Sequence, residues 1–107
     1  MNELFSKQIN RLDEAHFLVL YWTAVGEDKK MKYNITNVFD DLKIHKITRT
    51  KQSAVAFVDS LNALCFIEVR EESNRKNLYL TDHGGEAMQK LLEQDRFTIK
   101  NSNYLEG

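Results

Sequence analysis

The side chains with the clearest chemical potential in this sequence are basic, and they gather in the middle of the chain. Seven of them lie between residues 43 and 76, namely Lys43, Lys46, Arg49, Lys51, Arg70, Arg75 and Lys76. That stretch also holds four acidic residues, so its net charge is +3, whereas the remainder of the chain has a net charge of −4. Lysine and arginine neutralise phosphate groups, and an arginine can also read the shape of a narrow minor groove. The distribution indicates that one part of a nearly neutral protein contacts an anionic partner.

Patterns typical of catalysis or metal binding are not found in the sequence. There is no nucleophile–base motif and no HExxH pattern, and Gly84-Gly85 lacks the rest of a glycine-rich phosphate loop. The three histidines, His16, His45 and His83, are too widely separated for the usual ligand spacing. We therefore predict a protein that is not an enzyme and that holds neither a metal ion nor another cofactor.

Length and composition indicate a single soluble domain spanning residues 1–107. The chain has no proline and no long apolar run, and its first residues lack the basic-then-apolar order of a secretory signal. These features predict a cytoplasmic protein without a membrane partner. Cys65 is the one cysteine, so it has no partner for an internal disulfide, and we expect it to be a small core residue.

The elements that must position the basic residues begin with helices. Residues 2–25 have helical apolar spacing, and the part from residue 16 to 25 is apolar all round, which fits a helix central to a core or shared between two subunits. Gly26 predicts the end of this helix. Residues 33–35 are expected to form a short bridging strand, and residues 36–42 a helix capped by Asn34 or Thr36.

A second helix, over residues 49–64, is predicted with Thr48 as its N-cap. The apolar residues of this helix share one face, and the opposite face is small, polar or basic near the N-terminus, which suits close approach to another surface. Residues 66–70 and 78–81 predict paired strands joined by a loop over residues 71–77. Thr81 or Asp82 would then cap a last helix, while the tail after Arg96 is either disordered or packed as a terminal arm.

The predicted order is helix, short strand, helix, helix, β-hairpin and helix, an α+β fold that is mainly α. Two helices joined by a tight turn and followed by a hairpin form a winged helix-turn-helix. In that arrangement the second helix enters the major groove of DNA, and the hairpin is the wing.

Residues 50–92 add several features at a recognisable spacing. These are Val58-Asp59-Ser60-Leu61 at a helix end, the junction Cys65-Phe66-Ile67, Asn74-Arg75-Lys76 at the hairpin tip, and Leu80-Thr81 with Gly84. In this combination the chain resembles the MarR family of bacterial transcription regulators and the related SarA-like regulators of Gram-positive bacteria. Three positions differ from the family's usual residues: Cys65 replaces a glycine, Asn74 an aspartate, and Ala56 a residue that is commonly basic.

The resemblance implies a homodimer with interleaved terminal helices that presents two recognition helices to a palindromic site in double-stranded DNA. It places Gln52, Ser53, Val55 and Ala56 at the bases, Arg49 and Lys51 near phosphates, and Arg75 in the minor groove. A glutamine at this place can form paired hydrogen bonds to adenine. The complete set of predicted DNA-binding residues is Lys46, Thr48, Arg49, Lys51, Gln52, Ser53, Val55, Ala56, Arg70, Arg75 and Lys76.

Other readings of the same residues stay open. The acidic Glu68, Glu71 and Glu72 in the hairpin are compatible with a wing that is simply solvated, or with a winged-helix module that docks on another protein. A DNA-binding accessory in replication or plasmid transfer would share the fold.

The aromatic residues of the N-terminal region leave a further possibility. Phe17, Tyr21 and Trp22, together with His16, could line an effector pocket at a dimer interface. Aromatic residues at helical spacing are more often plain core, so a small-molecule effector has no support of its own. His45, in the predicted helix turn, is in a position to touch a phosphate.

Overall fold

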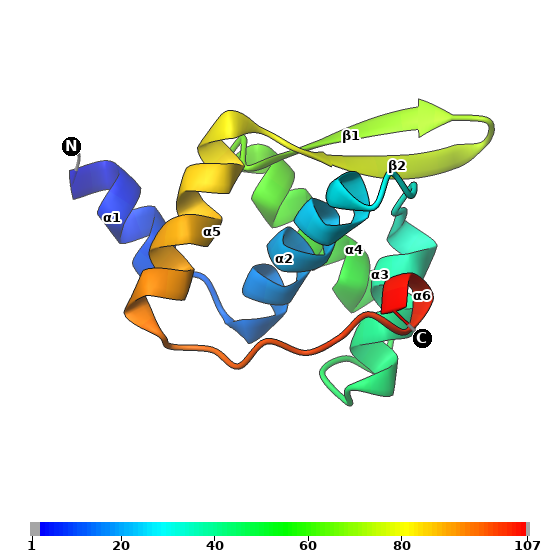
Figure 1. The fold of residues 1–107 in the computed structure, drawn as a ribbon, viewed down its shortest axis with the longest axis horizontal. Coiled ribbons are helices and arrows are strands. Elements are labelled where there is room, and N and C mark those ends of the chain that lie inside the picture. The colour runs from blue at the N-terminus through cyan, green and yellow to red at the C-terminus, as the bar shows by residue number, and fades with distance from the viewer. Residues whose placement is uncertain (1–2, 107) are drawn as a thin grey trace.

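Residues 3–106, the part of the chain that the computed structural model describes, contain six helices and two strands (Figure 1). In chain order these are α1 (Glu3–Asn10), α2 (Glu14–Asp28), α3 (Ile35–Ile44), α4 (Lys51–Ala63), β1 (Ile67–Glu72), β2 (Arg75–Leu80), α5 (Asp82–Gln94) and α6 (Asn103–Glu106). The strands pair antiparallel from Ile67 opposite Leu80 to Glu72 opposite Arg75. The prediction of a mainly helical α+β protein with one antiparallel hairpin is confirmed.

The first predicted helix, over residues 2–25, is wrong as a single element; its start at Asn2 lies outside the described residues. The chain breaks after α1 and starts again at α2, because Asp13 caps the second helix: its backbone N–H donates to Nδ1 of His16 at 3.0 Å. Arg96 donates to the carbonyl oxygens of Ile9 and Leu12 at 3.4 and 3.1 Å and so satisfies the end of α1.

Helix α2 is the centre of the core. Its residues Phe17 to Leu20 and Trp22 are at most 1% exposed, and α4, α5, α6 and β2 pack around it. Of the two explanations for a helix that is apolar all round, this structure shows the core helix. No helix between residues 3 and 106 is long and apolar enough to cross a membrane.

The prediction that Gly26 ends this helix is wrong, because α2 continues to Asp28. The stop is a Schellman motif in which Lys30 has a positive φ of 58° and Met31 N–H donates to the Gly26 carbonyl at 2.8 Å. Helix α3 ends in the same way at Lys46, with a φ of 62°. Because neither left-handed residue is glycine, the usual sequence signal for a helix end is missing.

Two short-range features around α3 and α4 bear on the predicted caps. Asn34 caps α3 by accepting from Asn37 N–H at 2.9 Å, which confirms one of the two proposed caps. Of the bridging strand predicted over residues 33–35, only Asn34 pairs, in an isolated bridge with Asn77, because Ile35 already belongs to α3. The predicted N-cap Thr48 of the next helix is wrong. Thr50 caps α4 instead, accepting from Ser53 N–H at 3.1 Å.

The junction between α4 and β1 corrects the expectation for Cys65. This residue is exposed, not buried in the core, and takes a φ of 64° at the end of a third Schellman motif, in which Phe66 N–H donates to the Leu61 carbonyl at 2.9 Å. Glycine adopts that conformation without strain. The glycine that is usual here in the resembled family therefore has a direct backbone explanation.

The hairpin is longer and its loop tighter than predicted. Strands β1 and β2 extend to Glu72 and from Arg75, so the predicted loop over residues 71–77 shrinks to the pair Ser73 and Asn74. Both have positive φ, 51° and 66°, as a two-residue type I′ turn requires. The two strands project beyond the helices at their turn end (Figure 1).

A close backbone contact fixes the base of the hairpin to α5. Thr81, one of the two predicted caps, accepts from Gly84 N–H at 2.8 Å, and its hydroxyl lies 2.6 Å from the carbonyl oxygen of Cys65 and 3.1 Å from that of Phe66. A Cβ atom on Gly84 would lie 1.8 Å from the Phe66 oxygen. The Leu-Thr-x-x-Gly pattern thus fixes the base of the hairpin to the following helix.

Candidate nucleic-acid interface

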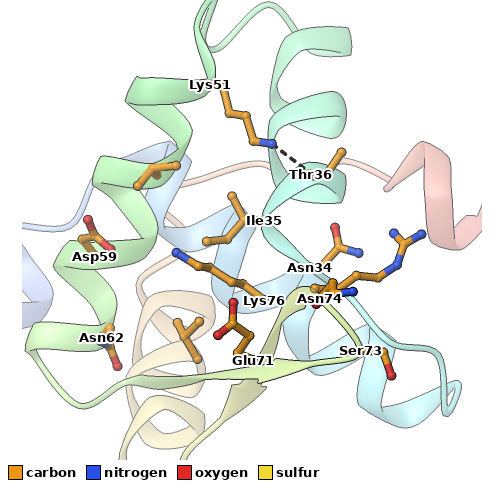
Figure 2. A pocket seen from close by; sticks show the side chains of 13 residues that line it. Asn34, Ile35, Thr36, Lys51, Asp59, Asn62, Glu71, Ser73, Asn74 and Lys76 are labelled. Atoms are coloured by element: carbon orange, nitrogen blue, oxygen red, sulfur yellow. Dashed lines mark hydrogen bonds between the residues drawn. The ribbon is translucent and has the colours of Figure 1, made fainter.

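An open groove with a volume of about 810 Å³ runs between α4 and the hairpin (Figure 2). The N-terminus of α3 supplies Asn34, Ile35 and Thr36, α4 supplies Lys51, Val55, Asp59 and Asn62, and the hairpin supplies Val69, Glu71, Ser73, Asn74, Arg75 and Lys76. The groove therefore brings together the two elements that the sequence singled out as recognition helix and wing.

The α4 side of the groove starts at the helix N-terminus. Lys51, the first helical residue, reaches across to α3, where its Nζ donates to Oγ1 of Thr36 at 3.2 Å (Figure 2). Gln52 and Ala56 are exposed beside it, and Val55 is half-buried in the groove wall. These residues lie at a helix end whose free backbone N–H groups and dipole favour an anion.

Two of the predicted residues serve the structure of the turn. Thr48 is only 7% exposed, and its hydroxyl donates to the Thr50 carbonyl at 3.3 Å, so it does not present that group to a partner. Ser53 is exposed, but its hydroxyl accepts from the Thr50 hydroxyl at 3.0 Å as part of the cap. Lys46 and Arg49 are exposed on the same turn.

The hairpin face turned away from the groove holds a network of paired charges. Arg70 forms an ion pair with Glu68 and stacks over the Tyr79 ring at 4.3 Å. Glu72 accepts from the Tyr79 hydroxyl at 2.5 Å and lies 3.6 Å from Nζ of Lys32. Two of the three acidic side chains in the hairpin, Glu68 and Glu72, thus have partners within the protein, and so does Arg70, one of the three basic residues predicted there to bind DNA.

The contacts of this network shift the pKa values of Glu72 and Arg70 in opposite directions. Hydrogen bonds from Asn77 and Tyr79 lower the pKa of Glu72, which favours its charged form. The hydrogen bond and the charge of Glu68 raise the pKa of Arg70. Both shifts favour the charged forms that make the surface ion pairs of Glu72 with Lys32 and of Arg70 with Glu68.

Arg75 and Lys76 remain available near the hairpin tip. Both are exposed, and neither forms an ion pair with any residue between 3 and 106. Lys76 points from the hairpin into the groove together with Glu71, its partner across the two strands, and Asp59 faces them from α4 (Figure 2). The groove is therefore basic at the α4 N-terminus and the hairpin tip, and mixed in charge between them.

Nine residues of the groove wall are not among the predicted DNA-binding residues: Asn34, Ile35, Thr36, Asp59, Asn62, Val69, Glu71, Ser73 and Asn74. A signal for two of them was present, because Lys51, Val55, Asp59 and Asn62 recur at helical spacing and define one stripe of α4. Asn34 and Thr36 reach the groove through the packing of α3 against α4 and the hairpin, for which the sequence carries no local signal.

The histidines and aromatic residues are structural in the described chain. His16 is half-buried with its ring edge against Phe57 at 5.2 Å, and His45 stacks on Trp22 at 5.8 Å. Phe17 and Trp22 are buried in the core, and Tyr21 is half-buried with its ring stacked on Phe17 at 6.1 Å. Within residues 3–106 no three histidine, cysteine or acidic side chains come close enough to hold a metal ion.

Comparison with models of protein families found no match, and comparison with curated proteins found none either.

Proposed function

We propose that this protein binds double-stranded DNA as a winged helix-turn-helix and acts as a transcriptional regulator. Helices α3 and α4 are the helix-turn-helix, α4 is the recognition helix, and the β1–β2 hairpin is the wing. The MarR-like and SarA-like resemblance of residues 50–92 supports the proposal, and for a bacterial regulator of this kind it also supports a cytoplasmic location.

One observation carries the proposal: the exposed N-terminal half of α4 and the hairpin tip border the same groove, which Lys51, Arg75 and Lys76 line. Lys46 and Arg49 are exposed in the turn directly before α4. A recognition helix flanked by phosphate-binding cations is what major-groove docking needs. The small side chain of Ala56 permits close approach to the base edges.

The paired charges on the other hairpin face remove an objection to this reading. Glu68 and Glu72 are occupied by Arg70, Tyr79 and Lys32, so they do not compete with a phosphate for Arg75. Glu71 and Asp59 stay free in the groove and repel a backbone that enters it too deeply. We infer that DNA contacts the two rims of the groove and not its floor.

We also propose that the protein works as a homodimer. Apolar side chains are exposed on the terminal segments, with Leu4 67%, Leu92 37% and Ile99 45% accessible. The Cα atoms span 37 × 27 × 26 Å. Two such molecules related by a two-fold axis can place their α4 helices one helical turn of DNA apart, roughly 34 Å.

A second function is favoured by the mixed charge of the groove. With Asp59 and Glu71 facing Lys76, the groove also suits a peptide carrying both signs of charge (Figure 2). In that case changing Arg49 and Arg75 to alanine disturbs a protein complex, while affinity for DNA is negligible throughout.

The test is equilibrium binding of the protein to a short random-sequence duplex at rising salt. The five basic side chains of this surface that form no ion pair within the described part of the chain limit the slope of log K against log salt to a magnitude of about 4.5 per protomer, because each phosphate contact contributes about −0.9. Binding at low ionic strength with a linear salt dependence supports the proposal. No binding at low ionic strength refutes it and leaves the protein-docking function.

A further inference from the structure

The end of the chain lies across α2 and α3 as a strap (Figure 1). The C-terminal strap, residues 96–106, leaves α5 after Asp95, which ends that helix with a φ of 52°. It runs without regular structure to α6, the short helix beside α3. The sequence left open whether this tail is disordered or packed, and the structure shows it packed.

The main attachment of the strap is the carboxylate of Asp41, which is fully buried in α3. Oδ2 accepts from the Tyr33 hydroxyl at 2.6 Å and from the Ser102 hydroxyl, while Oδ1 accepts from the backbone N–H groups of Asn103 at 2.9 Å and Tyr104 at 3.4 Å. Three of these four donors belong to the strap. A buried carboxylate is costly unless it is hydrogen-bonded, so α3 holds this group at low cost only while the strap is in place.

A second attachment reaches the turn between α3 and α4. Nε2 of His45, the C-cap residue of α3, lies 2.7 Å from the carbonyl oxygen of Asn101 in the strap. A carbonyl only accepts, so this nitrogen carries the proton. The same ring stacks on Trp22, whose Nε1 donates to the Lys100 carbonyl at 2.7 Å. The strap thus touches the residue directly before Lys46, where the turn begins.

The strap is less deeply packed than the elements it covers. Within residues 96–106 only Ser102 and Leu105 are buried, whereas Ile99 and Tyr104 are 45% and 44% exposed. Segments with few buried contacts open locally at a lower free energy than the whole domain unfolds. Detachment therefore takes the donors away from Asp41 and the carbonyl away from His45 while the core around α2 stays folded.

From these contacts we propose that the C-terminal strap is a detachable latch on the helix-turn-helix. The attached strap holds α3 and the turn in the arrangement that the proposed DNA contact needs, and the detached strap leaves the turn mobile. The effect on DNA rests on the proposed function. The opening of the latch and its effect on the turn are properties of the protein alone.

The first test uses Trp22, the chain's one tryptophan, which is fully buried under the strap. Ser102→Ala removes one donor to Asp41 and the acceptor for Leu105 N–H, so we expect stronger acrylamide quenching and red-shifted emission. Thr98→Ala, an exposed position of the same strap, is the control and leaves both signals unchanged. A Ser102→Ala protein with wild-type quenching and emission overturns the proposal.

Amide hydrogen exchange supplies a second readout, first in the wild-type protein and then in the variant. In the wild-type protein, the strap amides of Asn103, Tyr104 and Leu105 are expected to exchange at least tenfold faster than core amides of α2. Ser102→Ala should accelerate exchange at residues 45–49 of the turn and leave the hairpin unchanged. Strap amides that exchange only with global unfolding, or a turn that does not respond, contradict the latch.

A DNA-binding measurement shows whether the strap positions the helix-turn-helix or contacts the DNA itself. Ser102→Ala is expected to weaken duplex binding several-fold with an unchanged salt slope, because no phosphate contact is lost. Unchanged affinity in a variant whose strap is open overturns the coupling. If the wild-type protein binds no DNA, the proposed function fails, and quenching and exchange still decide on the latch.

Discussion

Two adjacent glycines at the start of α5 are expected to respond to alanine with opposite signs. A Cβ on Gly84 lies 1.8 Å from the oxygen and 2.7 Å from the carbon of the Phe66 carbonyl, whereas the nearest atom to a Cβ on Gly85 is a Leu80 methyl at 3.8 Å. Neither glycine has a positive φ. The difference between them is therefore packing against the base of the hairpin, with backbone strain excluded.

In Gly84→Ala, α5 must move away from Phe66 until the distance between the new Cβ and the Phe66 carbonyl oxygen rises from 1.8 Å to at least 3.0 Å. Such a shift breaks the contacts of the Thr81 hydroxyl with the Cys65 and Phe66 carbonyls. Overpacking of this kind costs about 1–3 kcal/mol and a lost hydrogen bond about 1 kcal/mol, so the free energy of unfolding should fall by roughly 2–4 kcal/mol. Gly85→Ala places a methyl group in a helix, in ordinary van der Waals contact with Leu80, and should raise the free energy of unfolding by about 0.5–1 kcal/mol.

Urea unfolding followed by circular dichroism measures both variants against the wild-type protein. The expected result is a lower midpoint for Gly84→Ala and a higher midpoint for Gly85→Ala, with unchanged m-values. Equal effects at the two positions, or a Gly84→Ala protein as stable as the wild type, would refute the contact between α5 and the hairpin base.

Three further results are expected. Arg75→Ala should lower the magnitude of the salt slope for duplex binding by about 0.9. Arg70→Ala should change the slope far less, because an ion pair holds the Arg70 side chain in the wild-type protein. Equal effects of the two substitutions would contradict the assignment of Arg75 as the free residue at the hairpin tip. Burial lowers the pKa of His16 below 6.5, against the opposing effect of the Asp13 charge, so the folded state prefers the neutral ring that accepts from Asp13 N–H. The free energy of unfolding should therefore be highest above pH 6.5 and fall as the pH drops through and below that value. Urea unfolding at about pH 5 to 8 measures this profile, which His16→Gln should flatten. Cys65→Gly should raise the free energy of unfolding by about 0.5–1 kcal/mol because it relieves a residue at a φ of 64°, and a destabilised variant would show that the exposed thiol side chain packs favourably.

The sequence predicted the order of elements well where apolar spacing was strong. Helix α4, the hairpin and α5 follow from that spacing and from the cap residue Thr81. Helix ends were harder, because the left-handed positions that stop α2, α3 and α4 are Lys30, Lys46 and Cys65, and none of them is glycine. The backbone accepts the strain there because each position closes a Schellman motif.

The break between α1 and α2 and the packing of the strap depended on distant partners. Arg96 satisfies the end of α1 from more than eighty residues away, and Asp41 collects donors from the chain's last residues. Periodicity reports only on a local face, so neither contact has a signal of its own. The same limit explains why Asn34 and Thr36 were not predicted in the groove.

The charged hairpin illustrates what a sequence count of charges leaves out. Six charged residues lie in β1 and β2, and their alternation places Glu68, Arg70, Glu72 and Arg75 on one face and Glu71 and Lys76 on the other. On the first face, ion pairs neutralise the charges of Glu68, Arg70 and Glu72, and Arg75 near the tip is the one charged residue of that face without an ion pair to another described residue. The net charge of the segment therefore understates the basic character of the hairpin tip.

The most direct measurement of the central claim is an amide chemical-shift titration of the protein with duplex DNA at low ionic strength. The account predicts shifts at residues 46–56 and 73–76, the two rims of the groove, with α5 unaffected. Shifts confined to α5 or to the terminal helices, or no shifts at any residue, would contradict the assignment of α4 and the hairpin as a DNA-binding surface.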